Sequence, residues 1–342
     1  MKLFQRRQQY SLILGGKMST KGILITGGAG FIGSTCISFL NKQGINNIYV
    51  VDALGKDDKW KNLRSKRFLE FIPIDSLFEW LTPCRIDELQ AVIHLGACSS
   101  TREKDCDYLI QNNTLFSQKL AHVAVENNLR FIYASSAATY GMGEQGFSDT
   151  HSTLQTLCPA NMYGFSKHLF DLWMHQQGYL DCSVALKYFN VFGPNEWHKG
   201  GMSSHILRML PQAQGGEIRL FKSNDSAYKD GEQKRDFIYV KDAAAMTCHF
   251  LNDLDSSGVF NIGSGIPESW NTLAQAVMKS IKLDVPIEYI DMPEDLAKQY
   301  QNYTCADMSK YKSLQLAPQP SYCLHDAVDD YIQNHLLLDS YY

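Results

Sequence analysis

Tyr163 and Lys167 are the two residues of this sequence whose types and spacing best fit proton-transfer chemistry. The apolar residues that follow them, up to Trp173, recur at helical spacing, and residues four apart on a helix share a face. An ammonium group beside a phenol lowers the pKa of the phenol, which lets tyrosine exchange a proton near neutral pH. A Tyr-x-x-x-Lys pair is common by itself, so this interpretation depends on the residues around it.

A cluster of hydroxyl groups precedes this pair in the chain. Residues 131–134 are predicted to form a buried strand, and the sequence continues as Ser-Ser-Ala-Ala-Thr-Tyr-Gly through residue 141. Open α/β folds bind their ligands at the carboxyl edge of the sheet. We therefore expect Ser136 to face the same site as Tyr163 and Lys167.

A glycine-rich segment near the start of the chain predicts where a dinucleotide would lie. Residues 23–25 are typical of a buried parallel strand, and Gly28-Ala-Gly30-Phe-Ile-Gly33 follows with G-x-G-x-x-G spacing. The glycines permit a tight turn and close approach of backbone to a pyrophosphate, and the helix expected next would direct its free N–H groups at the phosphates. A second predicted strand, 47–51, ends in Asp52, near where an acidic residue meets the adenosine ribose. This context favours dinucleotide binding over an ordinary glycine-rich turn.

Two further features have simpler interpretations. A basic segment follows Asp52 and contains Lys56, Lys59, Lys61, Arg64, Lys66 and Arg67. Most of these side chains are expected to be solvated, while one or two would suit a 2′-phosphate on the adenosine ribose. His94 lies inside the apolar run 91–95 and is expected to be a core residue rather than a catalytic one.

Composition excludes several classes of protein. The chain has 342 residues, of which 44% are hydrophobic, and a net charge of −4 gives no general attraction to nucleic acid. Nine cysteines without a C-x-x-C pair favour a reduced, cytoplasmic protein, and no cluster of Cys and His predicts a metal site. No stretch reaches the ~18 apolar residues of a membrane span. Residues 1–17 are expected to be an extension outside the fold.

The alternation of predicted strands and helices indicates a Rossmann-like α/β fold, with a doubly wound parallel sheet and a smaller, discontinuous C-terminal substrate domain. We assign residues 20–190, 236–262 and 323–338 to the NAD(P)-binding domain, and 191–235 and 263–322 to the substrate domain. The ligand is expected between the two. Arg235 is suited to bidentate phosphate binding, although an ion pair with Asp236 or Asp242 is as plausible from the residues alone.

The motifs together resemble the extended short-chain dehydrogenase/reductase family, which includes sugar-nucleotide epimerases and dehydratases. The resemblance rests on Gly27-x-x-Gly30-x-x-Gly33, Ser136, Tyr140-Gly141 and Tyr163-x-x-x-Lys167. Longer blocks are similar to the members that epimerise ADP-heptose: HLGACSST from His94, YASSAATYG from Tyr133, KYFNVFGPNEWHKGGMSS from Lys187 and KRDFIYVKD from Lys234. The similarity extends from residue 21 to about residue 335.

The resemblance implies a role for each matching residue. Ser136, Tyr163 and Lys167 would be the catalytic triad, with Lys199 as a second proton-transfer group. Cofactor contacts would come from Gly27, Gly30, Phe31, Ile32, Gly33, Asp52, Lys59, Leu95, Gly96, Ala97 and Asn112, together with Tyr163 and Lys167. Substrate contacts would come from Ser136, Asn190, Lys199, Ser203, Arg235 and Tyr300. No metal is implied.

The implied reaction inverts C6″ of ADP-D-glycero-D-manno-heptose for lipopolysaccharide inner-core synthesis. The alcohol is oxidised, the keto sugar turns in the pocket, and the hydride returns to the opposite face. The implied cofactor is NADP, with NAD as the alternative, and it would be tightly bound and recycled. The implied assembly is a homo-oligomer, specifically a pentamer. The sequence departs from the family pattern at two places. Ala53 follows Asp52 where a polar residue is expected, which bears on the choice between NADP and NAD, and the segment 223–233 is longer than usual, which bears on contacts with the substrate nucleotide.

Two alternatives remain open from the sequence. Another nucleotide-sugar epimerase or a dehydratase would share these motifs, although residues 137–139 supply no carboxylate for elimination. A non-catalytic NAD(P)-binding sensor would also keep the fold. Such a sensor has no need of the Tyr163–Lys167 pair, which this chain retains.

Overall fold

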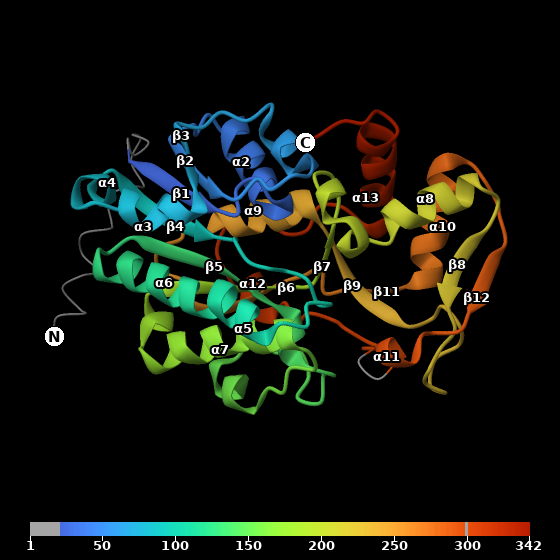
Figure 1. Ribbon diagram of the computed structural model, residues 1–342. Helices are drawn as coiled ribbons and strands as arrows, with labels where there is room; N and C mark the ends of the chain where they lie inside the picture. Colours follow the sequence, from blue (N-terminus) through green and yellow to red (C-terminus); the bar gives the residue numbers. More distant parts are fainter. Residues whose placement is uncertain (1–20, 298–299) are drawn as a thin grey trace.

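The structure, a computed structural model, describes residues 21–297 and 300–342, so the extension expected at 1–17 lies outside the described residues. Its larger lobe is built on a seven-stranded parallel sheet with strand order β10-β6-β5-β4-β1-β2-β3 (Figure 1). The strands are β1 (Gly22–Thr26), β2 (Ile48–Asp52), β3 (Glu70–Pro73), β4 (Leu89–His94), β5 (Arg130–Ser136), β6 (Ser183–Tyr188) and β10 (Gly258–Ile262). This confirms the predicted Rossmann-like α/β fold.

Helices cover both faces of this sheet. Figure 1 shows α2 (Phe31–Lys42) and α9 (Val240–His249) on one face, and α6 (Phe116–Glu126) and α7 (Met162–Gln176) on the other. The central strands are buried on both sides, which explains their continuous apolar runs rather than an alternating pattern. Shorter helical elements connect them: η2 (Asp58–Leu63), η3 (Ile74–Ser76), α3 (Leu77–Trp80), α4 (Pro83–Asp87), α5 (Cys106–Leu109), η4 (Ile110–Leu115), η5 (Ala137–Tyr140), η6 (His151–Thr156) and η7 (Tyr179–Asp181).

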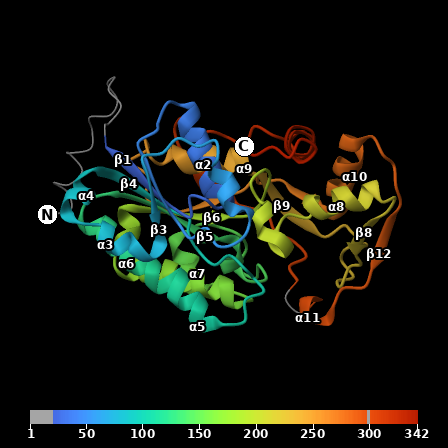
Figure 2. The same ribbon diagram turned by 45° about the horizontal axis from the view of Figure 1, so that its top comes forward.

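The smaller lobe contains two short sheets packed against helices (Figure 2). One sheet joins β7 (Asn190–Phe192), β9 (Lys234–Tyr239) and β11 (Pro267–Ser269), and the other pairs β8 (Ile218–Phe221) with β12 (Ile287–Ile290). The helical elements after β7 are η8 (Trp197–Met202), α8 (Ile206–Gln214), α10 (Trp270–Ile281), α11 (Glu294–Ala297), α12 (Ser309–Lys312), α13 (Leu324–Tyr331) and η9 (Ile332–Leu336). No helix in the described part of the chain is long and apolar enough to cross a membrane.

Two hydrophobic cores divide the chain differently from the predicted domain boundaries. The predicted division placed 323–338 in the nucleotide-binding domain, whereas Val328 and Tyr331 of α13 pack in the smaller lobe's core with Leu273 of α10. Conversely, Tyr311 of α12, predicted in the substrate domain, lies in the larger core. Helical periodicity predicts that an apolar face exists, but it does not specify which core receives that face.

Candidate active site

The first turn after β1 is shaped so that only glycine fits. Gly27 has a left-handed backbone (φ 67°), and a Cβ there would lie 2.6 Å from the backbone nitrogen of Gly96 in the turn after β4. A Cβ on Gly33 would overlap the carbonyl oxygen of Gly27. The start of α2 therefore packs directly on the glycine turn, which leaves its N-terminal N–H groups facing the carboxyl edge of the sheet.

Asp52 holds this turn in place. One carboxylate oxygen accepts from the backbone N–H of Ala29 at 2.8 Å. The other accepts from Ala53 N–H at 2.7 Å and from the Lys59 ammonium at 2.6 Å. The carboxylate is thus buried but partnered by a cation, and Lys59 brings positive charge to the place where the adenosine ribose is expected.

Ser136, Tyr163 and Asn190 line one cavity of about 210 Å³ at the carboxyl edge of the main sheet. Ser136 is the last residue of β5, and Tyr163 lies in the first turn of α7, where the Asn161 side chain accepts from Gly164 N–H at 2.8 Å. The Ser136 and Tyr163 side chains interact, since the Ser136 hydroxyl opposes the rise in the pKa of Tyr163 that burial causes. The two predicted catalytic oxygens are therefore held together by a strand end and a capped helix.

The electrostatics of Tyr163 and Lys167 differ from expectation. The spacing predicted that Lys167 lowers the pKa of the phenol, whereas burial raises the pKa of Tyr163 and the Ser136 hydroxyl opposes that rise. Lys167 instead donates to the carbonyl oxygen of Ala134 on β5 at 2.8 Å. Burial lowers the pKa of Lys167 to about 8, and the nearby Asp171 carboxylate limits this effect.

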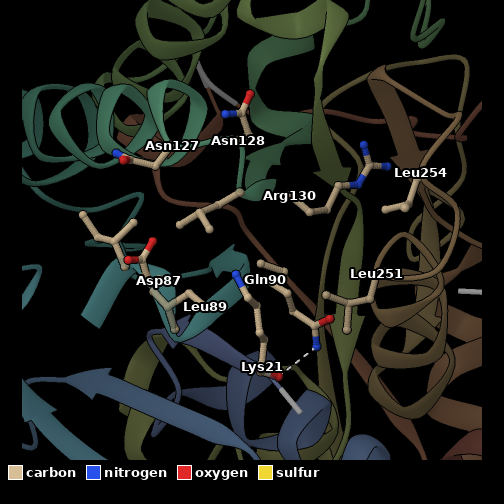
Figure 3. A pocket seen from close by; sticks show the side chains of 12 residues that line it. Lys21, Asp87, Leu89, Gln90, Asn127, Asn128, Arg130, Leu251 and Leu254 are labelled. Carbon is tan, nitrogen blue, oxygen red and sulfur yellow. Dashed lines mark hydrogen bonds between the residues drawn. The ribbon is translucent and has the colours of Figure 1, made fainter. Parts of the chain in front are cut away.

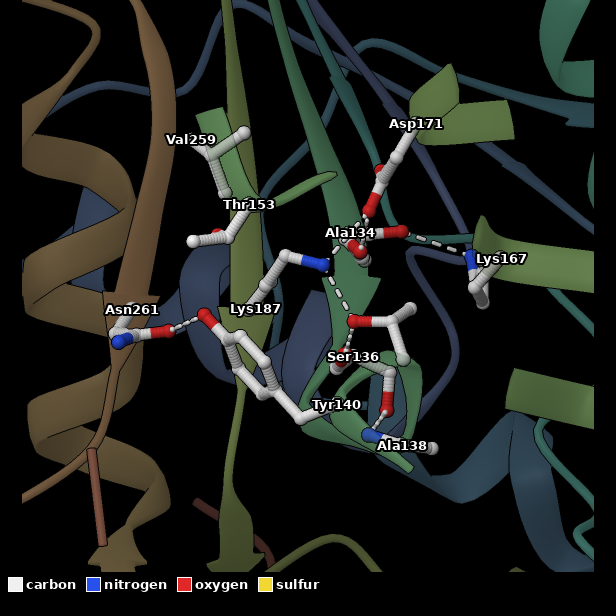
Figure 4. A network of polar contacts seen from close by, with 12 residues as sticks. Ala134, Ser136, Ala138, Tyr140, Thr153, Lys167, Asp171, Lys187, Val259 and Asn261 are labelled. Atoms are coloured by element: carbon white, nitrogen blue, oxygen red, sulfur yellow. Dashed lines mark hydrogen bonds and ion pairs between the residues drawn. The ribbon is translucent and has the colours of Figure 1, made fainter. Parts of the chain in front are cut away.

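A buried polar network lies behind this strand end (Figure 4). Asp171, one helical turn after Lys167, accepts from the Lys187 ammonium at 3.0 Å and from the Ser135 hydroxyl at 2.6 Å. Tyr133 donates to the other Asp171 oxygen at 3.0 Å, and Lys187 also donates to Thr139. The sequence analysis missed this network, which ties α7 to β5, β6 and η5 around Ser136, Tyr163 and Lys167.

Lys199 lies apart from Ser136 and Tyr163, near the start of α2. Its ammonium is 5.4 Å from the ring centroid of Phe31, the first residue of α2, and it is not among the residues that line the 210 Å³ cavity. Burial lowers the pKa of Lys199, while the buried Glu196 carboxylate opposes this. Ser203 donates to the carbonyl oxygen of Gly200 at 2.7 Å and so shapes the segment that carries Lys199.

Arg235 points its guanidinium at aromatic rings of the smaller lobe. Its Cζ lies 4.8 Å from the Tyr300 ring centroid, and the Tyr300 hydroxyl accepts from the Trp270 indole at 2.7 Å. The ion pair with Asp236, left open by the sequence, is not formed in the described structure, because backbone N–H groups of Ser264, Gly265 and Ala306 surround that carboxylate. Asp242 likewise accepts from Ser321 and Tyr322. Arg235 is buried, and its guanidinium has no carboxylate partner in the described chain.

Two neighbouring asparagines of η4 make different contacts. Asn112, the predicted cofactor contact, donates to the carbonyl oxygen of Tyr108 at 2.9 Å on the exposed side of η4. Asn113 is buried instead, and its side chain binds the backbone N–H of Cys98 at 2.8 Å and the Ser166 hydroxyl at 3.0 Å. The turn that contains Leu95, Gly96 and Ala97 is therefore fixed to α7 by Asn113, which sequence reasoning missed.

Two residues of the cavity were not predicted, and one histidine lies in the core as predicted. Thr101 and Gln301 line the 210 Å³ cavity, and the sequence analysis did not single out either of them. His94 is a core residue, as expected, because its two ring nitrogens bind Thr26 at 2.6 Å and Ser117 at 2.7 Å.

A larger cavity of about 370 Å³ lies at the opposite edge of the sheet, between the starts of β4 and β5 (Figure 3). Its one arginine, Arg130, is already engaged by the carbonyl oxygens of Phe250, Asp253 and Ser256 at 2.6 to 3.0 Å. Size alone therefore does not identify a reactive site, and the predicted catalytic residues line the smaller cavity at the carboxyl edge.

Comparison with known proteins agrees with this geometry. Residues 23–263 match the NAD dependent epimerase/dehydratase family. The chain is 45% identical over 315 residues to the ADP-L-glycero-D-manno-heptose-6-epimerase of Nitratidesulfovibrio vulgaris (strain DP4), covering 92% of this chain and 97% of the relative. It is 42% identical to the enzyme of that name from Fusobacterium nucleatum, covering 94% and 99%. The crystal structure of the Helicobacter pylori ADP-L-glycero-D-manno-heptose-6-epimerase superposes with a TM-score of 0.75 at 26% identity, covering 92% and 96%.

Proposed function

This chain belongs to the NAD dependent epimerase/dehydratase family, and from that membership we propose that it interconverts the C6″ epimers of ADP-glycero-D-manno-heptose. The observation that carries the proposal is 45% identity over almost the full length of both chains to an ADP-L-glycero-D-manno-heptose-6-epimerase. Ser136 and Tyr163, which line one cavity, supply the chemistry that such a reaction needs.

The residues present fit a nicotinamide dinucleotide. Gly27, Gly30 and Gly33 form a cradle that side chains would fill, and Asp52 and Lys59 lie at its adenosine end. We prefer NADP to NAD because Lys59 neutralises the Asp52 carboxylate, which would otherwise repel a 2′-phosphate. When bound, the nicotinamide would accept a hydride from C6″ and later return it.

Tyr163 is assigned to proton exchange at the C6″ oxygen, and the Ser136 hydroxyl would hydrogen-bond that oxygen as its charge changes. Lys167 would hold the cofactor ribose. Inversion requires proton transfer on each face of the flat carbonyl, and one base cannot easily reach both. Lys199 is our candidate for the second face, because its ammonium approaches the fingerprint end of α2 from a different corner than Tyr163.

Substrate recognition is assigned mainly to the smaller lobe. Arg235 is buried against Tyr300 without a carboxylate partner in the described chain, as expected of a cation that awaits a diphosphate. Asn190 and Ser203 are also assigned to substrate binding. Asn190 lines the cavity with Tyr163, and Ser203 lies in the segment that carries Lys199. We further propose that the enzyme acts in the cytoplasm as a homo-oligomer, a pentamer by resemblance, and supplies lipopolysaccharide inner-core synthesis.

The test is to incubate purified protein with ADP-D-glycero-D-manno-heptose and to follow the heptose signals by NMR. We expect the L-glycero epimer to appear without added cofactor, and denatured protein to release NADP on chromatography. Bound nucleotide without turnover would favour the sensor. A different epimer or a dehydrated sugar would assign the chain to another reaction of the family.

A further inference from the structure

Tyr341 and Tyr342, called here the aromatic tail, lie on the larger lobe beside the segment that carries Lys199. After η9 the chain crosses from the smaller lobe to α2, where both ribbon views place its end (Figures 1 and 2). The Ser38 hydroxyl of α2 donates to the Tyr342 main-chain oxygen at 2.9 Å, and Lys66 donates to the same atom. The tail is therefore bound to the helix that begins at the glycine fingerprint.

Asn195 connects the tail to the site. Its carboxamide oxygen accepts from Tyr342 N–H at 2.9 Å, and its amide group donates to the Tyr342 main-chain oxygen at 3.2 Å. The same amide group donates to the Ser34 hydroxyl of α2 at 3.0 Å. Asn62 of η2 in turn donates to the Asn195 carbonyl oxygen at 3.0 Å. One side chain thus joins the tail, α2 and the segment 195–199.

Asn195 has a left-handed backbone, with φ 76°, and is completely buried. Asparagine adopts this region more readily than other non-glycine residues, but its contacts must still hold it there. The paired contacts with Tyr342 supply part of that constraint, and without them the buried carboxamide would lose partners on both of its atoms.

The rings of the tail add a second set of contacts. Tyr341 packs against Trp197 with ring centroids 4.5 Å apart and ring planes tilted by 42°, and Arg64 lies 4.9 Å from the Tyr341 centroid. The Lys42 ammonium lies 3.8 Å from the Tyr342 centroid. Trp197 is two residues before Lys199, so the tail contacts this short segment at both Asn195 and Trp197.

We propose that Tyr341 and Tyr342 are positioning residues that hold the segment 195–199 against α2 and so place Lys199 at the fingerprint end of that helix. The proposal rests on the proposed function only for the role of Lys199. A tail that merely stabilised the fold would contribute to unfolding free energy without controlling this one lysine.

The principal variant stops after Ser340, and its matched control is Leu338→Ala, an exposed side chain of the same C-terminal segment. A second variant, Tyr341→Leu with Tyr342→Leu, keeps the main-chain hydrogen bonds and most of the bulk, in case the shortened chain does not fold. For each we would measure kcat, KM, Tm, and the rate at which an amine-reactive acylating reagent modifies Lys199, followed by mass spectrometry.

We expect the shortened chain to lose at least about tenfold in kcat with KM changed less than about threefold. Lys199 should be acylated several-fold faster, and millimolar Tyr-Tyr dipeptide should restore part of the protection and of kcat. The leucine variant should show a smaller effect in the same direction, and Leu338→Ala should match wild type.

Unchanged acylation of Lys199 in a folded shortened chain would overturn the proposal, as would a lower Tm with unchanged kcat. Because acylation does not depend on turnover, it decides the proposal even if the wild-type protein fails to epimerise ADP-heptose, and that failure would count against the proposed function alone.

Discussion

At the residue scale, the two proposed proton-transfer groups, Tyr163 and Lys199, lie in different parts of the site. Tyr163 lies in the cavity with Ser136, whereas Lys199 lies against Phe31. Two separate groups suit inversion, because the hydride leaves one face of C6″ and returns to the other, so the oxygen of the turned carbonyl exchanges its proton from a different position in each half-reaction.

We therefore expect Tyr163→Phe and Lys199→Met each to lower the rate of interconversion by roughly 10²-fold or more, the usual effect of losing a general acid or base. Each variant should retain one half-reaction. The measurement is to supply an analogue already oxidised to the carbonyl, with bound reduced cofactor, and to identify the stereoisomer formed. Opposite products support one group per face. The same isomer from both variants, or near-normal epimerisation by Lys199→Met, would reassign Lys199 to substrate anchoring.

Arg235→Ala should weaken substrate binding more than it slows the chemical step. A hydrogen bond to a charged group contributes about 1.5–3 kcal/mol, which predicts a KM raised roughly 10- to 100-fold with kcat changed less than about threefold. Arg219→Ala is the matched control, because Arg219 is an exposed arginine of the same lobe. A collapse of kcat with unchanged substrate affinity would contradict the phosphate assignment of Arg235.

Local motifs were predictable at this scale, and long-range partners were not. Helical spacing brought Tyr163 and Lys167 onto one face, and the strand end placed Ser136 beside them. The pKa of Tyr163 could not be predicted, because it depends on burial and on where the Lys167 ammonium points. Likewise, the Asn-Asn doublet at 112–113 offered two amides, and only packing against Cys98 decides which one is buried.

At the element scale, the glycine turn and the network behind β5 fix the site. The order of strands and helices was predictable from apolar runs and glycine spacing, since both follow from local sequence. The pairing of Asp171 on α7 with Lys187 on β6 was not, because it depends on which elements become neighbours.

Gly33→Ala should reduce retained nucleotide by about tenfold or more, because the added methyl group would overlap the Gly27 carbonyl oxygen and push α2 off the turn. Gly215→Ala is the control, since its backbone is not left-handed (φ −79°) and its Cβ would lie 3.3 Å from the nearest atom. Nucleotide released on denaturation, per mole of protein, is the measurement. Equal retention by the two variants would show that close packing at Gly33 does not matter for binding.

Lys187→Met should lower the free energy of unfolding by about 3–5 kcal/mol, because it leaves the Asp171 carboxylate buried without its cation. Arg85→Met, which breaks the exposed pairs with Glu70 and Glu88, should destabilise the protein much less. Urea unfolding of both variants checks this. Similar losses of unfolding free energy would show that the buried ion pair stabilises the fold no more than an exposed one does.

At the scale of the whole molecule, the buried histidines make stability depend on pH. Burial lowers the pKa of His94 from 6.5 to about 3, because its ring is enclosed between Thr26 and Ser117. The unfolded chain therefore binds more protons between about pH 6.5 and 3, so stability is full above this range and falls as the pH drops through it.

At pH 5 this histidine alone should cost about 2 kcal/mol of the stability present at neutral pH. The measurement is urea unfolding at pH 7 and pH 5 for wild type and His94→Gln, since other histidines contribute to both proteins and cancel in the comparison. The wild-type loss should exceed the loss of the variant by about 2 kcal/mol. Equal losses would show that His94 is protonated in the folded protein.

The position of β10 has a consequence for how the active site forms during folding. This edge strand pairs with β6 although about 70 residues separate them in sequence, and its Asn261 accepts from the Tyr140 hydroxyl at 2.7 Å, next to the catalytic strand end. Contacts of such high sequence separation form late, because the chain entropy of a long loop must be lost first. The glycine turn packs on Gly96 in the turn after β4 at a similar sequence separation, so a folding chain would complete both its nucleotide cradle and the wall behind Ser136 only after distant segments have come together.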